Sequence, residues 1–171
     1  MLDFDGRVRV RFDVHVYLIA GVLSVLPISE LRGAIPYALA NRVAIPVAFI
    51  MCTFLNMLVA PAVFLFLSTL HELFCRVGWY DRAINRLLSR AQEKVRAKVE
   101  RYGYYGVMLF VAIPLPITGA YTGTLGAWVL GLDRKKTLLA VSAGVLIAGI
   151  IVTIVAALGI EALSIFIKPE G

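Results

Sequence analysis

The sequence has few charged side chains. Only 16% of its 171 residues are Asp, Glu, Lys or Arg, whereas a soluble domain has about a quarter. Three runs contain no charged residue at all, at 43–70, 102–132 and 137–160. Because roughly 20 apolar residues cross a hydrocarbon core about 30 Å thick, each run is long enough to reach across a bilayer. The pattern excludes an ordinary soluble protein and predicts an all-α integral membrane protein, with residues 1–171 forming a single membrane domain.

Cysteine is also scarce, and no metal-binding pattern accompanies it. Cys52 and Cys75 lack ligands at metal-binding spacing, so we expect both to be inert packing residues. His71-Glu-Leu-Phe-Cys75 begins like the zinc-protease sequence His-Glu-x-x-His, but a cysteine replaces the second histidine. No serine–histidine pair and no pair of carboxylates is expected at comparable depth in different segments. We therefore predict that the chain is not an enzyme and uses no metal or cofactor.

Basic residues are numerous and unevenly placed. Eight Lys and Arg residues lie between residues 71 and 101, and three more occupy positions 134–136. The net charge of +6 could suggest nucleic acid, but the sequence offers no polar domain to bind it. Cytoplasmic loops of membrane proteins collect Lys and Arg. The pattern thus predicts a multi-pass protein of the cell membrane, with its central basic segment in the cytoplasm and both termini outside.

Residues 14–41 are expected to form a re-entrant helical hairpin. An apolar stretch is interrupted by Glu30 and Arg32, with Pro27 and Pro36 on either side. A charge at the bilayer centre costs about 2.5–3.5 kcal/mol on insertion scales, so such residues face a cavity or the protein interior. Irregular backbone at membrane depth needs the same shelter.

Residues 43–70 are expected to form a full transmembrane helix. Pro46 falls in its first turn, where the missing N–H costs little, and Pro61 near its far end should kink it. Asn56 is the strongly polar side chain between the two prolines. The favoured interpretation of Asn56 is a hydrogen bond between helices, worth about 0.6 kcal/mol. The alternative is a substrate ligand.

Residues 71–102 are expected to form an amphipathic helix lying in the membrane interface. Apolar positions recur every three or four residues, and basic residues fill the remaining faces. This combination is typical of interfacial helices, and Trp79 and Tyr80 suit that depth. A soluble helical linker is the alternative.

A second re-entrant hairpin is expected at 103–132. The uncharged run would reach about 46 Å as one straight helix, and Pro114-Leu-Pro116 in its middle forbids a continuous helix. Each arm alone is too short to cross. The tip should therefore lie near Pro114–Gly119, and residues 137–160, rich in small side chains, should form a second transmembrane helix.

The unit of hairpin and span thus occurs twice, with the basic helix between. Arg32-Gly-Ala aligns with Thr118-Gly-Ala at an offset of 86 residues. Because each unit contributes one crossing, the second must be inverted relative to the first. Inverted repeats with broken helices are a transporter design, in which substrate is held near the bilayer midplane. Two hairpins and two spans shield little polar surface from lipid, which favours a homodimer.

Glu30 and Arg32 are the strong charges predicted at membrane depth. They could be an ion pair that lets the first hairpin fold. In the functional alternative, the planar fork of Arg32 binds an anionic group while Glu30 exchanges a proton. A carboxylate that competes with substrate for one arginine would act as an exchange switch.

The tip of the second hairpin is expected to lie opposite these charges. Exposed N–H groups at the start of a half-helix attract anions, and glycine lets the backbone approach closely. Gly119-xxx-Gly123 is also a small-residue packing motif. The predicted substrate and proton site comprises Glu30, Arg32, Pro36, Asn56, Pro114, Pro116, Thr118, Gly119 and Gly123.

At Glu30-Leu-Arg-Gly-Ala-Ile-Pro36 the sequence closely resembles the small multidrug export proteins, a group that looks like a compact branch of the DedA superfamily. Tyr104-Tyr-Gly106, followed by Pro114, Pro116 and Thr118-Gly-Ala, looks like the second family block. The resemblance covers most of residues 14–160. It implies two opposed re-entrant hairpins, each followed by a span, with Glu30 as the hairpin carboxylate and Arg32 as the adjacent base.

Relatives in DedA proper are linked to flipping of polyprenyl-phosphate carriers, to lipid scrambling and to proton-coupled transport. DedA proteins usually carry an arginine before the proline of the second hairpin. Here Ala112 and Ile113 precede Pro114. This departure argues against transport of a phosphate carrier.

Three functions are compatible with these features. The first is a membrane transporter or flippase for an anionic lipid head group or small amphipathic anion, coupled to protons. The second is a proton-driven small multidrug exporter, which predicts an acidic site without the basic partner that Arg32 provides. The third is a non-transporting, lipid-organising membrane protein in which Glu30 is structural.

Overall fold

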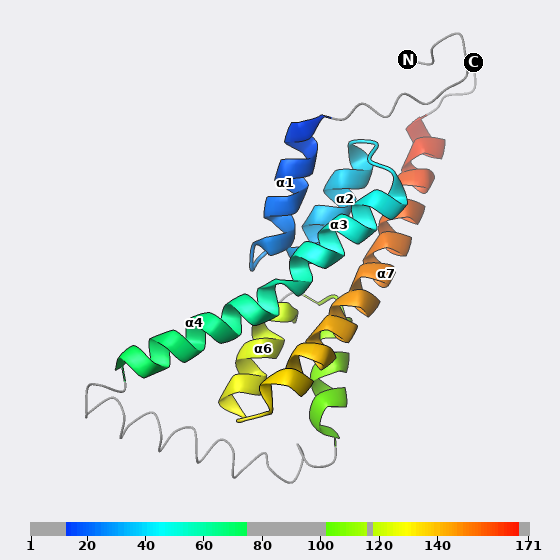
Figure 1. Cartoon of the computed structure of the whole chain (residues 1–171). Coiled ribbons are helices and arrows are strands. Elements are labelled where there is room, and N and C mark those ends of the chain that lie inside the picture. The colour runs from blue at the N-terminus through cyan, green and yellow to red at the C-terminus, as the bar shows by residue number, and fades with distance from the viewer. Residues whose placement is uncertain (1–12, 75–101, 116–117, 168–171) are drawn as a thin grey trace.

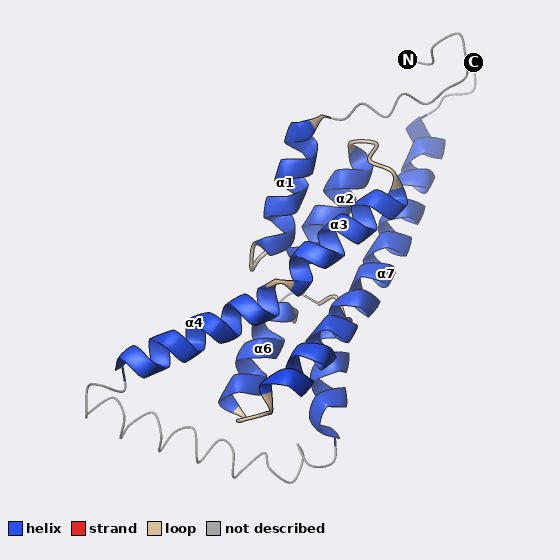
Figure 2. Cartoon of the chain, in the orientation of Figure 1, coloured by secondary structure: helices blue, strands red, loops and turns tan. Residues whose placement is uncertain are grey.

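The computed structural model describes residues 13–74, 102–115 and 118–167, and this part of the chain is helical (Figure 2). The helices in chain order (Figure 1) are α1 (Val14–Val25), α2 (Glu30–Ala40), α3 (Ile45–Met57), α4 (Val59–Phe74), the helix Tyr102–Ala112, α6 (Ala120–Val129) and α7 (Arg134–Ile167).

Two segments of the described chain are long and apolar enough to cross a bilayer. They are Ile45–Thr69, which comprises α3 and most of α4, and Arg134–Ile160 within α7. Their lengths of 25 and 27 residues exceed the roughly 20 residues that a hydrocarbon core requires. They coincide with the spans expected at 43–70 and 137–160. The remaining helices are too short to cross.

The first span is broken at Leu58, and Pro61 explains the position of the break. α3 ends at Met57 and α4 begins at Val59. Proline lacks the N–H that would bond to the carbonyl four residues earlier, and its ring crowds that carbonyl. For Pro61 the carbonyl is that of Met57, so the helix is interrupted there and α4 leaves the direction of α3 (Figure 1). Pro46 lies in the first turn of α3, as expected.

The short helices form two pairs at opposite ends of the molecule. α1 packs against α2 in one half, and the helix Tyr102–Ala112 and α6 occupy the other half, with the connecting turns of both pairs facing the middle (Figure 1). The segment from α3 through α4 and the helix α7 run in opposite directions. Adding the repeat offset of 86 to the bounds of α1 gives 100–111, close to the helix Tyr102–Ala112. The hairpins expected at 14–41 and 103–132 are thus helix pairs; that they are re-entrant stays a prediction.

The core is centred on α2. This helix packs against α1, α3 and α7, and its buried apolar residues are Leu31, Ala34, Ile35, Ala38 and Leu39. α2 therefore lies in protein on several sides, which is the shelter that a short helix at membrane depth needs.

Glycines let α7 approach its neighbours closely. A Cβ atom on Gly144 would lie 2.6 Å from the carbonyl oxygen of Met108 and 2.7 Å from Cβ of Val111. A Cβ on Gly149 would lie 2.7 Å from Oγ1 of Thr53 in α3. The small residues of the second span thus serve helix contact, as expected.

The predicted interfacial helix falls mostly outside the described residues, which resume at 102. α4 continues through Phe74, so the first four residues of this segment are helical.

The Gly144 contact predicts a stability difference between two glycines of one helix. Gly144→Ala should lower the free energy of unfolding by about 1–3 kcal/mol, because the new methyl group meets a backbone carbonyl that cannot move alone. Gly159→Ala is the matched control, since a Cβ there meets no atom within 4 Å. Thermal unfolding in detergent micelles measures both. Equal stability of Gly144→Ala and the wild type would contradict the close approach.

Candidate functional site

The tips of the two helix pairs meet at a small cavity in the middle of the molecule. The cavity has a volume of about 10 Å³, which is room for about one water molecule. Apolar residues of α7, among them Val145 and Ala148, form one wall. The predicted site residues that line it are Glu30, Arg32, Asn56, Pro114, Thr118 and Gly119.

The carboxylate of Glu30 caps the N-terminus of α6. Glu30 is only 6% exposed, and the backbone N–H groups of Ala120 and Tyr121 donate hydrogen bonds to its carboxylate. The residue that precedes α6 is Gly119, which has no side chain to cap the helix, and a Cβ atom there would overlap the Glu30 carboxylate. Orphan N–H groups and the helix dipole both favour an anion at this place. The first hairpin therefore supplies the cap that the second lacks.

The backbone of Glu30 is held in a rare conformation. Its φ angle is 45°, in the left-handed region that non-glycine residues adopt at a cost of order 1–3 kcal/mol. Glu30 is the first residue of α2, and its N–H bonds to the carbonyl of Leu26 across the turn. Such conformations persist where surrounding contacts over-determine them and are concentrated at functional sites.

Arg32 joins the same two tips through a second contact. Its Nη2 donates a hydrogen bond to the carbonyl oxygen of Thr118, and it lies 3.7 Å from Oε2 of Glu30. The distance between Arg32 and Glu30 is longer than a hydrogen bond, so the two side chains attract each other as opposite charges. Each of them forms its hydrogen bonds with the second hairpin instead. The side chain of Arg32 is 26% exposed and that of Glu30 8%.

The hydrogen bond from Arg32 to Thr118 connects the two positions that the repeat offset of 86 aligns. The Thr118 hydroxyl is bonded within its own tip, 2.6 Å from the carbonyl oxygen of Ile113 and 3.1 Å from the N–H of Leu115. The side chain of Thr118 thus stabilises the turn of the second tip, and its backbone carbonyl accepts the hydrogen bond from Arg32.

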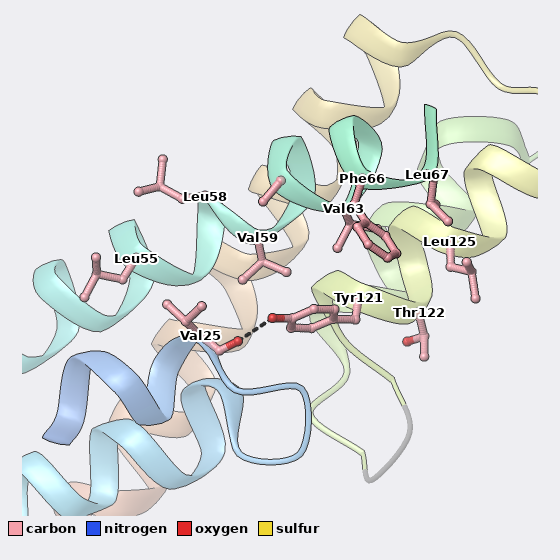
Figure 3. A pocket seen from close by; sticks show the side chains of 11 residues that line it. Val25, Leu55, Leu58, Val59, Val63, Phe66, Leu67, Tyr121, Thr122 and Leu125 are labelled. Atoms are coloured by element: carbon pink, nitrogen blue, oxygen red, sulfur yellow. Dashed lines mark hydrogen bonds between the residues drawn. The ribbon is translucent and has the colours of Figure 1, made fainter. Parts of the chain in front are cut away.

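The C-terminal end of α1 also depends on side chains from other helices. Asn56, 1% exposed, donates from Nδ2 to the carbonyl oxygen of Ser24 at 2.6 Å. The hydroxyl of Tyr121 donates to the carbonyl oxygen of Val25 (Figure 3). The last carbonyls of a helix have no intrahelical partner, and without water each unsatisfied one costs several kcal/mol. Asn56 therefore links two helices, which was the favoured interpretation.

Three predicted residues lie away from the cavity or outside the described chain. Pro36 lies within α2, where its missing N–H leaves the Arg32 carbonyl without its helical partner. Gly123 packs against Val111, so it serves the packing interpretation of its motif. Pro116 is not among the described residues.

Tyr121 is a site residue that the sequence analysis missed. Its N–H bonds to Glu30 and its hydroxyl to α1. Two signals could have identified it. Tyr121 lies two residues after Gly119, where a half-helix was expected to begin, and a tyrosine hydroxyl in an apolar environment needs a hydrogen-bond partner. Among the described residues, no group of three or more His, Cys, Asp or Glu could hold a metal ion, and Cys52 is buried in the core.

A helical protein with two candidate spans, and with an acidic and a basic side chain between opposed helix ends, has the architecture of a polytopic membrane protein. Residues 30–151 match the model of the family described as "Putative small multi-drug export protein". The match covers more than two thirds of the 171 residues, and the chain belongs to this family. The resemblance read from the sequence is confirmed to that extent, and the family description indicates a membrane transport role. No curated protein and no solved structure matches the chain.

The Tyr121 contact predicts a measurable cost of losing one hydroxyl. Tyr121→Phe should lower stability by about 0.6 kcal/mol and by at most about 1.7 kcal/mol, the range for hydrogen bonds between helices in membranes. Tyr105→Phe is the matched control, because Tyr105 is 75% exposed. Unfolding in mixed micelles compares the two variants with the wild type. A Tyr121→Phe protein as stable as the Tyr105→Phe protein would show that the Val25 carbonyl needs no partner.

Proposed function

We propose that the protein is a secondary transporter that moves an anionic lipid head group or a small amphipathic anion across the bilayer, coupled to protons. One observation carries this proposal: the Glu30 carboxylate occupies a site that is built for an anion. The N–H groups of Ala120 and Tyr121 and the charge of Arg32 surround it. Hydrogen bonds of this type, with an ionised partner, are among the strongest in proteins.

The same donors would serve the anionic group of a substrate. A phosphate or carboxylate approaching Arg32 competes with Glu30 for the start of α6, and Arg32 is exposed enough to be reached. Protonation removes the charge of Glu30 and with it the preference for the positive end of α6. Protonation of Glu30 therefore frees these donors for the substrate, and a bound substrate in turn favours the protonated form of Glu30, so that substrate and proton bind together at one place.

The arrangement of the hairpins supports alternating access. The hydrogen bonds that Glu30 accepts, and those that Arg32 and the Tyr121 hydroxyl donate, tie the two tips together. In transporters of inverted repeats, one repeat rocks against the other around a site at the midplane. We interpret the two units as such repeats, related to the DedA superfamily, with the central basic segment in the cytoplasm of a cell membrane.

Proton-driven export of small cationic drugs is the second candidate function, supported by the description of the family. A cation would pair with Glu30 but would meet the positive charge of Arg32, which lies 3.7 Å from the carboxylate. This repulsion is why the anionic substrate is preferred.

The decisive experiment follows flipping of a fluorescent lipid phosphate in liposomes, with and without a pH gradient. Wild type should flip the head group, and the gradient should change the rate. Glu30→Gln should lose the dependence on the gradient, because the amide cannot take up or release the proton. Arg32→Gln should slow flipping by about 10- to 150-fold, since a hydrogen bond to a charged group is worth about 1.5–3 kcal/mol. Arg42→Gln, at an exposed position, is the matched control and should flip like the wild type.

The other outcomes separate the candidates. A well-folded wild type that flips no lipid phosphate rules out that substrate, and uptake of ethidium by the same liposomes then tests cation export. A Glu30→Gln protein that unfolds more easily but flips normally, with the same gradient dependence, would make Glu30 a structural cap alone.

A further inference from the structure

An open apolar groove lies between the first span and α6 (Figure 3). Its volume is about 660 Å³, within the range of about 300–1,000 Å³ that is usual for small-molecule sites. One wall comes from α3 and α4, including Leu55, Val59 and Phe66, and the other from α6, including Tyr121 and Leu125. Apart from Tyr121 and Thr122, its lining is aliphatic or phenyl.

One wall of the groove is formed by residues at and after the break in the first span. Leu58 stands at the break, and Ala62 and Val63 follow it on α4. This wall belongs to the candidate span Ile45–Thr69, and its Leu58 and Phe66 are 49% and 63% exposed. The groove therefore opens onto the surface that hydrocarbon covers in a bilayer.

Tyr121 connects the groove to the Glu30 carboxylate. Its ring lines the groove, and its N–H bonds to the Glu30 carboxylate. A molecule whose anionic end reaches Arg32 and the start of α6 thus has its adjoining atoms beside Tyr121. The positive charge of Arg32 complements an anionic end, and the groove complements a hydrocarbon chain. Arg32 and the groove together therefore match a molecule that has an anionic end and a hydrocarbon chain.

We propose that this groove holds a hydrocarbon chain of an anionic membrane lipid whose head group is handled at Glu30 and Arg32. The inference rests on the proposed transport function and specifies its substrate class. A membrane lipid is favoured over a soluble anion because the groove opens toward the bilayer. Lipid tails are as apolar as leucine side chains, so the chain gains little by leaving the bilayer. The groove acts through shape, and it keeps the head group beside the cavity.

Photolabelling tests the site directly. The probe is hexadecyl phosphate with a diazirine at its last carbon, in phosphatidylcholine liposomes that contain the full-length protein. Labels should concentrate on α4 and α6, and unlabelled hexadecyl phosphate should compete for them while hexadecyltrimethylammonium should not. Ala62→Trp should lower labelling about tenfold, because the indole fills the groove. Leu65→Trp is the matched control on the same helix, 61% exposed and outside the groove lining.

A second variant guards against misfolding, since Leu125→Trp fills the groove from the opposite wall at a residue that is 46% exposed. Equal labelling of all helices, unchanged by Ala62→Trp and Leu125→Trp, would overturn the proposal. A change of oligomeric state in both variants, without competition by hexadecyl phosphate, would assign the groove to a second copy of the chain and overturn it too.

Flipping assays on the same liposomes distinguish the two proposals. Specific labelling without flipping by the wild type would reject transport and leave the lipid site standing. Flipping that neither tryptophan variant changes, together with uniform labelling, would reject the groove site and leave transport standing.

Discussion

The structure depends on side chains that satisfy the ends of its short helices from other helices. Every helix end leaves backbone N–H or C=O groups unpaired, and at membrane depth each one costs several kcal/mol. Here Glu30 pairs with the N–H groups that begin α6, while Asn56 and Tyr121 pair with the carbonyls that end α1. Each partner comes from a different helix than the end it satisfies. The contacts of Glu30 and Tyr121 therefore satisfy helix ends and also hold the two helix pairs together, while the contact of Asn56 joins α3 to α1.

Much of the architecture follows from apolar length and proline. Charge-free runs located both spans, and Pro61 indicated the bend in the first because a missing N–H acts on the carbonyl one turn earlier. The helix pairs could be predicted because charges or a proline interrupt the apolar stretches. Glu30 and Arg32 do so in the first pair and Pro114 in the second, and the arms that remain are too short to cross a bilayer. The end of the first span, expected at residue 70, lies at Thr69, and the helix α4 that contains it continues through Phe74.

The sequence predicted which residues form the site better than it predicted how they contact one another. Charge at membrane depth and glycine after proline identified Glu30, Arg32 and Gly119, which line one cavity. No sequence pattern showed that Glu30 would cap α6, because that contact joins residues about 90 positions apart through tertiary packing. Tyr121 was missed for the same reason: an aromatic residue in an apolar helix is ordinarily a packing residue, and its hydrogen bonds depend on where α1 ends.

The bond between Arg32 and Thr118 has a consequence for how such a chain can diverge. Residues 32 and 118, which the offset of 86 aligns, touch one another through the Arg32 guanidinium and the Thr118 backbone carbonyl. Two arginines would bring like charges together in a place with little water, and two threonines would leave the Glu30 carboxylate without a positive neighbour. The charge can therefore be carried by one half alone. The two aligned positions are therefore not interchangeable, and the positive charge of Arg32 distinguishes the first from the second.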